Sequence, residues 1–291
     1  MSRLTVPKTY KLYIGGKFPR TESGRSIPIL DRNGDTAAHI CHASRKDFKE
    51  AVEVAAKAAP SWSAVTGYLR GQIIYRMAEM LEGRREEFAS AICVTSKVTI
   101  ASARNEVDAS VDRLVCFAGW TDKYQQVLGC QNPVATNFYN FTIPVSQGVT
   151  CVIAPDEPPL LGLVTMIAAP LCAGNTIIVL GSQLHPISTA IFGEVCQTSD
   201  VPSGVINLLT GLRADLIEHI ATHRQVASIN AAVSRKQDRV TIEIGAADSI
   251  KRVHFSSLSG DDWYDSKLAA SPWAIEPFVE MKTIWHPSAS R

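Results

Sequence analysis

The 291-residue sequence lacks the short motifs by which most phosphate, metal and acyl-transfer sites are recognised. It contains no G-x-G-x-x-G, no Walker A loop, no H-E-x-x-H and no G-x-S-x-G. Its seven cysteines form no C-x-x-C pair, and its seven histidines show no metal-ligand spacing. We therefore expect reduced, mostly buried thiols and no metal site, and the motifs alone indicate only a soluble protein.

The sequence also lacks a charge bias and any segment suited to a membrane. Lys and Arg total 29 against 28 for Asp and Glu, so no nucleic-acid partner is expected. Residues 1–16 contain no apolar core of a secretory signal, which favours a cytoplasmic location. The longest uncharged run, 158–193, is interrupted by Pro170 and by Gly174-Asn175. We expect buried core there rather than a membrane span.

The first half of the chain shows the apolar periodicity of helices. The segment 11–18 alternates and turns at paired glycines, which predicts a hairpin. Ser44 and Asp47 have the spacing of a capping box, so a helix is expected to begin there and to end at Pro60. Two further apolar stripes follow, and helices are therefore predicted to fill the range 44–125.

From Gly148 the pattern changes to short apolar strands that alternate with helices. The expected strands are 149–154, 175–180, 205–211, 226–230 and 251–256, and the helices between them begin at about 159, 187, 213 and 235. Short links between alternating strands and helices indicate βαβ units, and hence a parallel sheet. The expected fold class is α/β, with a doubly wound parallel sheet.

A polar stretch and a final strand follow the last of these units. Residues 258–277 are typical of a loop with a short helix, whereas 278–287 alternates like a strand. An exposed terminal strand can pair with another chain, so this segment is a candidate interaction surface.

Several segments, taken in order, resemble the NAD(P)-dependent aldehyde dehydrogenase superfamily. They are KLYIGGKF, DFKEAVEVAAKAAPSWS, RMAEMLEGRREEFA, EVDASVDRLVCFAGWTDK, GVTCVIAP, PLCAGNTIIVL, DVPSGVINLLTG and VEMKTIWHP. The resemblance implies a Rossmann-like cofactor domain with NAD(P) as its cofactor. It also implies an N-terminal helical segment and an oligomerisation arm.

The implied boundaries divide the chain into three parts. The first is an aldehyde-dehydrogenase-like nucleotide-fold domain at 1–257. It contains N-terminal helices at 44–125, an arm segment at 131–147 and a βαβ core at 148–257. A linker at 258–277 follows in place of the catalytic domain, and an oligomerisation strand at 278–291 ends the chain.

The chain departs from the family where the first core strand ends. The family usually has Pro-Trp-Asn-Phe-Pro, whose Asn helps to form an oxyanion hole, whereas this chain has Pro155-Asp156-Glu157-Pro158-Pro159. An ionised Glu157 accepts hydrogen bonds and repels an oxyanion. Acids near a helix N-terminus are also favoured by the helix dipole, by about 0.3–1 kcal/mol. Both interpretations hold together if no anion has to be bound at this position.

The family positions that contact the nucleotide are also altered. They fall here at Ala154, Pro155, Leu180, Ser182, Gly211 and Ser234. Leu180 replaces a lysine that contacts the ribose, and a leucine cannot act as a cationic donor. In the family, the pyrophosphate of the cofactor approaches the protein backbone at the position that corresponds to Val233, and here a branched side chain is added at that position. NAD(P) is therefore a cofactor implied by the resemblance only.

The catalytic carboxylate of the family allows two registers in this sequence. In one register Glu243, within TIEIGA, is the general base. The other register keeps the following helix at full length without a gap and places Ser256 at that position, where no comparable base is available. We prefer the second register. No cysteine follows Cys196, so the family's nucleophilic thiolate has no counterpart, and Glu157 and Ser256 mark degenerate catalytic positions.

Three functional interpretations follow. The first is a non-catalytic subunit that assembles with a full-length aldehyde dehydrogenase, or with itself, through 137–145 and 278–287. The second is an NAD(P)-dependent aldehyde oxidoreductase subunit that keeps its cofactor and uses a nucleophile supplied by a partner chain. The third is a module that binds a cation or metal in the strand-end crevice beside Asp156 and Glu157. We favour the first, in which the chain alone is not an enzyme.

Overall fold

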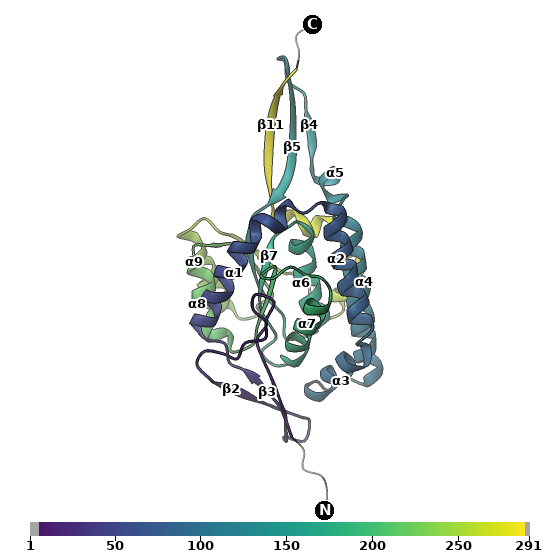
Figure 1. Cartoon of the computed structure of the whole chain (residues 1–291), viewed down its shortest axis with the longest axis vertical. Helices are drawn as coiled ribbons and strands as arrows, with labels where there is room; N and C mark the ends of the chain where they lie inside the picture. The colour runs from purple at the N-terminus through teal and green to yellow at the C-terminus, as the bar shows by residue number, and fades with distance from the viewer. Residues whose placement is uncertain (1–5, 289–291) are drawn as a thin grey trace, which may run out of the picture.

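The computed structural model describes residues 6–288, and its centre is a five-stranded parallel sheet (Figure 1). The strands are β6 (Val149–Ile153), β7 (Thr176–Leu180), β8 (Ile206–Leu209), β9 (Val226–Ala231) and β10 (Arg252–Phe255). They lie in the order β10-β9-β6-β7-β8, so the strand order switches direction at β6. Every residue of β6, β7 and β8 is buried, as expected for apolar strands covered on both faces. The predicted strands and fold class are confirmed.

Helices cover both faces of this sheet, which makes it doubly wound. The connecting helices are α6 (Leu161–Cys172), α7 (Ile187–Thr198), α8 (Arg213–Thr222) and α9 (Lys236–Ala247). Figure 1 shows α6 and α7 on one face of the sheet and α8 and α9 on the other. Two groups of buried apolar side chains fill the spaces on either side. The uncharged run that contains α6, β7 and most of α7 is therefore buried core, as predicted.

The N-terminal helices complete both layers. They are α1 (Arg45–Ala64), α2 (Gly67–Glu82), α3 (Arg85–Thr95), α4 (Ile100–Trp120) and α5 (Tyr124–Leu128). α1 packs on the sheet beside α8, while α2 and α4 pack together against α6. The predicted capping box at the start of α1 is present, because Ser44 accepts from the N–H of Asp47 and Asp47 accepts from the N–H of Ser44.

The prediction that Pro60 ends the first helix is wrong. α1 continues to Ala64 with Pro60 inside it. Pro60 lies on the exposed side of the helix, where the carbonyl group that loses its partner can be hydrated. Trp62 is only 1% exposed and anchors the last turn in the core. Burial of one large side chain thus outweighs the local signal of the proline.

The N-terminal residues form a small sheet below the main one. β1 (Lys8–Tyr10), β3 (Thr36–Cys41) and β2 (Ser26–Leu30) lie in the order β1-β3-β2. The predicted hairpin is reduced to a single bridge between Ile14 and Lys17. Tyr13 instead bridges Leu208 of β8, so this segment borders the edge of the main sheet.

The segment between β10 and the last strand is packed against the body. It contains η1 (Gly260–Trp263), α10 (Ser266–Ala269) and η2 (Pro272–Phe278). Trp263, Ile275 and Phe278 lie in the main core. The buried guanidinium of Arg113, in α4, donates to the carbonyl oxygens of Trp263 at 2.9 Å and Ala269 at 2.8 Å. The segment that we predicted as a linker is therefore anchored from within the body.

An antiparallel three-stranded arm extends from the body (Figure 1). It consists of β4 (Cys130–Asn132), β5 (Phe138–Ser146) and β11 (Val279–Pro287), in the order β11-β5-β4. β5 and β11 pair over their full length, from Val279 opposite Ser146 to Pro287 opposite Phe138. The predicted oligomerisation strand at 278–291 thus corresponds to β11, and its last residues, 289–291, lie outside the described residues.

The buried amide of Asn175 holds the base of this arm, together with the side-chain amide of Gln147, which donates to the carbonyl oxygens of Pro277 at 2.9 Å and Val279 at 3.2 Å. The Asn175 side-chain oxygen accepts from the backbone N–H groups of Gln147 at 2.8 Å and Gly148 at 3.0 Å. Its amide nitrogen donates to the carbonyl oxygen of Phe278 at 2.8 Å. Both long strands of the arm are therefore fixed at the same point of the body.

Candidate functional site

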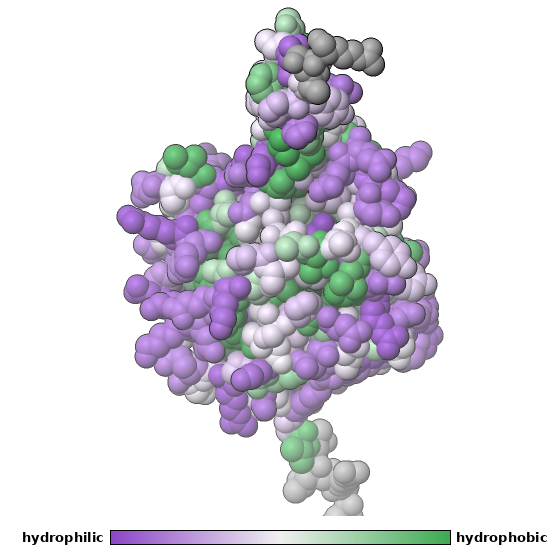
Figure 2. All heavy atoms as spheres, turned by 45° about the horizontal axis from the view of Figure 1, so that its top comes forward, coloured by the Kyte–Doolittle hydropathy of each residue, from purple (hydrophilic) through white to green (hydrophobic). Residues whose placement is uncertain are grey.

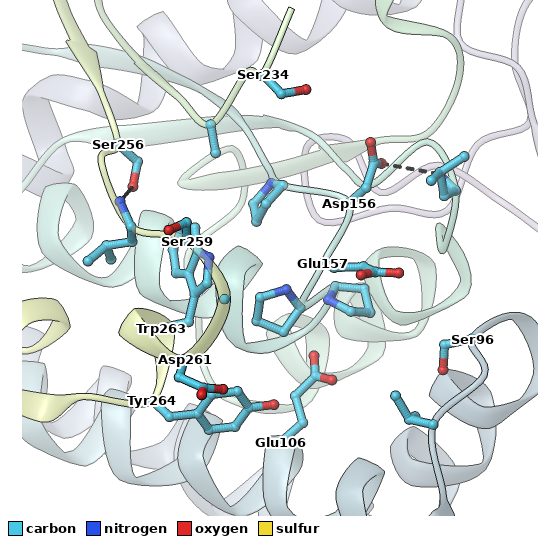
Figure 3. A pocket seen from close by; sticks show the side chains of 18 of the residues that line it. Ser96, Glu106, Asp156, Glu157, Ser234, Ser256, Ser259, Asp261, Trp263 and Tyr264 are labelled. Carbon is cyan, nitrogen blue, oxygen red and sulfur yellow. Dashed lines mark hydrogen bonds between the residues drawn. The ribbon is translucent and has the colours of Figure 1, made fainter.

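A cavity of about 1140 Å³ opens at the carboxyl ends of β6, β9 and β10 (Figure 3). Its walls come from the β6–α6 connection, the β9–α9 connection and the residues after β10, and α4 and η1 close its lower end. Ligands of open α/β sheets bind in crevices of this position, next to the point where the strand order switches. The sheet therefore places a hollow where its topology predicts one.

The sequence-predicted residues divide into two groups. Pro155, Glu157, Ser234 and Ser256 line the cavity. Ala154, Leu180, Ser182 and Gly211 do not line it and are buried. Asp156 lies between these two groups of residues, and its hydrogen bonds separate the second group from the cavity.

Asp156 turns away from α6 and binds the neighbouring loop. Its Oδ1 accepts from the backbone N–H groups of Gln183 at 2.8 Å and Leu184 at 3.2 Å and from the hydroxyl of Ser182 at 3.0 Å. Its Oδ2 accepts from Nη1 of Arg213 at 2.6 Å. This carboxylate therefore bridges the ends of β6 and β7 to the start of α8.

Charge and hydrogen bonding keep Asp156 ionised. Burial alone would raise the pKa of its carboxyl group, but Arg213 and the amide donors outweigh that effect and hold the pKa below its usual value. Arg213 also donates from Nη2 to the carbonyl oxygen of Ala154 at 2.8 Å. The ion pair thus lies across the end of β6.

The two acids do not cap α6, although the sequence predicted that role. Oε1 of Glu106, in α4, accepts from the backbone N–H groups of Leu160 at 2.7 Å and Leu161 at 3.1 Å. These are the first amides of α6. The acid that lies at the positive end of the helix dipole is therefore Glu106, 54 residues before Leu160 in the chain. Sequence reasoning missed Glu106, even though it is a single acid within the buried stripe of α4 between Ala103 and Ser110.

Glu106 is also the one strongly perturbed acid of the cavity. It is 4% exposed, and burial raises the pKa of its carboxyl group to about 7, against the lowering effect of the two amides. Figure 3 shows Glu106 beside Tyr264 at the end of the cavity opposite Ser234. Burial, followed by the nearby charges of Glu106 and Asp261, raises the pKa of the Tyr264 hydroxyl to about 12.

Glu157 and the two alternative base positions have different surroundings. Glu157 is exposed, with Oε1 3.5 Å from Nε2 of His185. Ser256 lies at the cavity wall, where its hydroxyl oxygen accepts from the N–H of Leu258 at 3.3 Å. Glu243 is exposed within α9 and does not line the cavity. The cavity therefore presents a hydroxyl, and not a carboxylate, at the end of β10.

Three buried thiols of the sheet and its helices are not activated as nucleophiles. Cys151, Cys172 and Cys196 are buried, and burial raises the pKa of each thiol, to about 12 for Cys172. A thiol needs a lowered pKa to react as a thiolate near neutral pH. None of the cysteines lines the cavity within residues 6–288.

A sequence profile of the aldehyde dehydrogenase family matches residues 20–262. The chain belongs to the aldehyde dehydrogenase family. It is 27% identical over 259 residues to mouse cytosolic 10-formyltetrahydrofolate dehydrogenase, covering 87% of this chain and 29% of that protein. It is 29% identical over 251 residues to the cytosolic 1 aldehyde dehydrogenase of Elephantulus edwardii, covering 84% of this chain and 49% of that protein.

Solved structures give the same family and the same partial coverage. The chain is similar to an aldehyde dehydrogenase from Bacillus cereus in complex with NAD⁺, with a TM-score of 0.81 and 25% identity, covering 85% of this chain and 50% of that one. A putative aldehyde dehydrogenase from Burkholderia cenocepacia has a TM-score of 0.81 and 28% identity, covering 87% and 51%. The chain thus spans about half the length of these relatives and less than a third of the mouse protein.

The residues at the family's nucleotide positions do not fit NAD(P) in this chain. The amide N–H groups of Gln183 and Leu184 and the Arg213 guanidinium all bind Asp156, as does the Ser182 hydroxyl. Leu180 is buried and belongs to the core beneath the sheet. A phosphate or ribose would meet a fixed carboxylate at the place where donors are required.

Between residues 6 and 288, no three His, Cys, Asp or Glu side chains are grouped so that they could hold a metal ion. None of the helices in this part of the chain is long and apolar enough to span a membrane.

Proposed function

We propose that this aldehyde dehydrogenase family member is a non-catalytic subunit that assembles with a full-length aldehyde dehydrogenase through its arm. The observation that carries the proposal is the arm, which extends beyond the body and exposes both apolar side chains and a strand edge (Figures 1 and 2). Figure 2 shows hydrophobic residues gathered on the arm just above the body. A surface of this kind is typical of one that another chain covers.

The register of β5 and β11 gives the arm two different faces. Successive side chains of a strand point to opposite faces, and directly paired residues share a face. One face therefore carries an apolar row along β5, formed by Tyr139, Phe141, Ile143 and Val145, and Ile284 of β11 extends it. The other β11 positions on this face are Glu280, Lys282 and His286, so the row is bordered by polar side chains at the open edge. The opposite face has a polar centre, where the Asn132 amide donates to Asn140 at 2.6 Å and the hydroxyl of Thr142 lies 3.0 Å from that of Thr283. Exposed apolar side chains flank this centre, namely Phe138, Met281 and Trp285.

The edge of the arm also remains open. β11 is the outermost strand in the order β11-β5-β4, so one side of its backbone has no partner among the described residues. An open strand of nine residues is a template for β-augmentation by another chain. Lys282 and Glu280 lie along it and disfavour unspecific pairing, because charged side chains protect natural edge strands.

The crevice supports the non-catalytic part of the proposal. The cavity wall has Ser256 where the family has its base, and its β6 end is closed by Asp156 and Arg213. Three of the buried thiols are not activated. The chain therefore keeps the groups that fold and assemble it, and we place it in the cytoplasm, where its seven free cysteines stay reduced.

An NAD(P)-binding subunit with a nucleophile supplied in trans is the alternative, which the likeness to a solved NAD⁺ complex favours. Thermal unfolding with and without NAD⁺ or NADP⁺ separates the two, because a ligand that binds the native state raises Tm. We expect no rise with either nucleotide. A saturable rise would contradict the non-binding subunit and support the alternative.

The test of assembly is native mass spectrometry of the tagged protein, purified gently from its own cell. We expect a full-length aldehyde dehydrogenase at fixed stoichiometry. An Ile284→Lys variant places a charge in the apolar row and should lose that partner. Thr283→Lys places the same charge one residue away, in the polar centre of the opposite face, and is the matched control that should retain it.

Two outcomes would overturn the assembly proposal. A chain that arrives alone as a monomer has no such partner. A homo-oligomer that Ile284→Lys dissociates shows that a second copy covers the arm, which contradicts assembly with a full-length enzyme.

A further inference from the structure

Asp156 is bound in the way that proteins bind a free anion. Two backbone N–H groups, a hydroxyl and a guanidinium converge on its carboxylate at distances between 2.6 and 3.2 Å. The two amides belong to the turn that precedes α7, and the guanidinium comes from the first residue of α8. Successive backbone N–H groups combined with an arginine are the usual components of a carboxylate or phosphate site.

The donors of this site are held in place by contacts that do not involve Asp156. The Ser182 hydroxyl accepts from the backbone N–H of His185 at 2.8 Å. Arg213 is fixed at both ends, because its Nη2 donates to the carbonyl oxygen of Ala154 at 2.8 Å and its backbone N–H donates to Oε1 of Gln183 at 3.0 Å. The positions of the donors are therefore set by the fold, and the carboxylate fills a preorganised site.

One donor in the site is left over. Nε of Arg213 is buried and has no hydrogen-bond partner among the described residues. A side-chain carboxylate tethered to β6 reaches one Nη group but not this nitrogen. A free oxyanion is not tethered and has more freedom to satisfy the guanidinium edge.

We propose that the turn before α7 and Arg213 form an oxyanion-binding site whose resident ligand is the chain's own Asp156 carboxylate. Removal of that carboxylate opens the site to a small oxyanion, namely a carboxylate or a phosphate. The Asp156 side chain is 25% exposed, so solvent ions can reach the vacated position. The inference concerns contacts within the body and holds whether or not the arm has the proposed partner.

Chemical rescue tests the proposal. Asp156→Ala removes the carboxylate and keeps Cβ, so formate replaces the missing group, and Asp156→Gly pairs in the same way with acetate. Thermal unfolding of each variant is followed against formate, acetate, phosphate and chloride at constant ionic strength. We expect a saturable rise in Tm of several degrees for each variant with its matched carboxylate and no comparable rise with chloride.

Control variants separate a site from a general salt effect. In the double variant Asp156→Ala/Arg213→Met the guanidinium is gone, and the rescue should disappear. Wild-type protein should show no anion-specific rise, because its own carboxylate occupies the site. A phosphate response in Asp156→Ala, repeated with adenosine monophosphate, shows whether the opened site accepts a phosphate ester as well as a carboxylate.

Three results would overturn the proposal. Equal responses to all anions, or rescue that persists without Arg213, would show that no oxyanion site exists. If Asp156→Ala does not fold in the absence of anions, refolding yield across the same anion series replaces Tm. A yield that formate does not restore above that with chloride then refutes the site.

Discussion

The strand-end crevice and the arm differ in whether their polar and apolar groups are bound or covered by other parts of the chain. In the crevice, Asp156 binds Arg213 and the neighbouring amides within one chain. In the arm, the edge of β11 and the apolar row beside Ile284 have no such cover among the described residues. Under the function proposed above, binding occurs through the arm and not in the crevice.

If this comparison is correct, substitutions in the body change stability and substitutions in the arm change association. The largest effect on stability is expected for Arg113→Met, because three acceptors, Trp263, Ala269 and Thr165, lose their donor. Loss of a buried charged donor from such a network costs about 3 kcal/mol of the free energy of unfolding. Urea unfolding measures it.

Arg104→Met in the same helix is the control for that experiment. Arg104 pairs with Glu86 at the surface, where solvent screening leaves exposed ion pairs with little effect on stability. Equal midpoints for the two variants would mean that Arg113 does not anchor the segment between β10 and β11.

The second prediction concerns the ion pair that closes the crevice. Asp156→Asn should lower the free energy of unfolding at pH 7 by about 2 kcal/mol, because a charge-assisted network is lost. The folded-state pKa of Asp156 lies below its unfolded value. The wild-type advantage is therefore fully present above about pH 4, the ordinary value for Asp, and disappears as pH falls through the lower folded-state value.

Unfolding of the two proteins between pH 7 and pH 3 measures this difference. Asp215→Asn, which removes a half-exposed carboxylate beside His42, is the control and should change little. A difference between wild type and Asp156→Asn that stays constant through the acid range would exclude the charge as its cause.

The third prediction has the opposite pH dependence, because burial raises the pKa of Glu106 to about 7. Between the unfolded value of about 4.3 and pH 7 the folded protein holds a proton that the unfolded chain has released. Stability should therefore fall as pH rises through this range, by roughly 2 kcal/mol between pH 5 and pH 7. Glu106→Gln keeps an acceptor for the amides of α6 and should remove this decline.

Thermal or urea unfolding from pH 5 to pH 8 tests that expectation. The stability of Glu106→Gln relative to wild type should grow with pH. Glu79→Gln, an exposed acid of α2, should follow wild type throughout. If Glu106→Gln also runs parallel to wild type, Glu106 is ionised across the whole range.

The smallest effect on stability is expected in the arm. Ile284→Lys should change the free energy of unfolding of the isolated chain by about 0.5 kcal/mol or less, as for surface substitutions in general. Thr283→Lys should behave alike, although only Ile284→Lys is expected to abolish association. A large loss of stability from Ile284→Lys would show that the arm is part of the cooperative body and would weaken the contrast between the two regions.

The βαβ core could be predicted from sequence because its signals are local. β7 is a run of apolar residues after Gly174-Asn175, and both its position and its complete burial follow from that run. The family resemblance, and not residue spacing, indicated that β5 and β11 belong to one arm. Their pairing joins distant parts of the chain, which periodicity cannot show.

The contacts of the candidate site could not be read from local patterns. Asp156 stands close to α6 in sequence, but its partner Arg213 is 57 residues away, and the amides of α6 are taken by Glu106 from a different helix. Pro60 was misread for a related reason, since the burial of Trp62 decided where α1 ends. In each case the outcome was decided by contacts in the folded chain, which local sequence patterns do not show.

The pairing of β5 with β11 also orders events during synthesis of the protein. Thr142 and Thr283, which meet across the arm, are 141 residues apart. At about 5–20 residues per second, the ribosome makes β11 roughly ten to thirty seconds after β5. Throughout that interval the nascent chain carries β5 without its longest neighbour, while the sheet behind it can already fold. The arm is therefore completed only after the strands of the sheet behind it have been made.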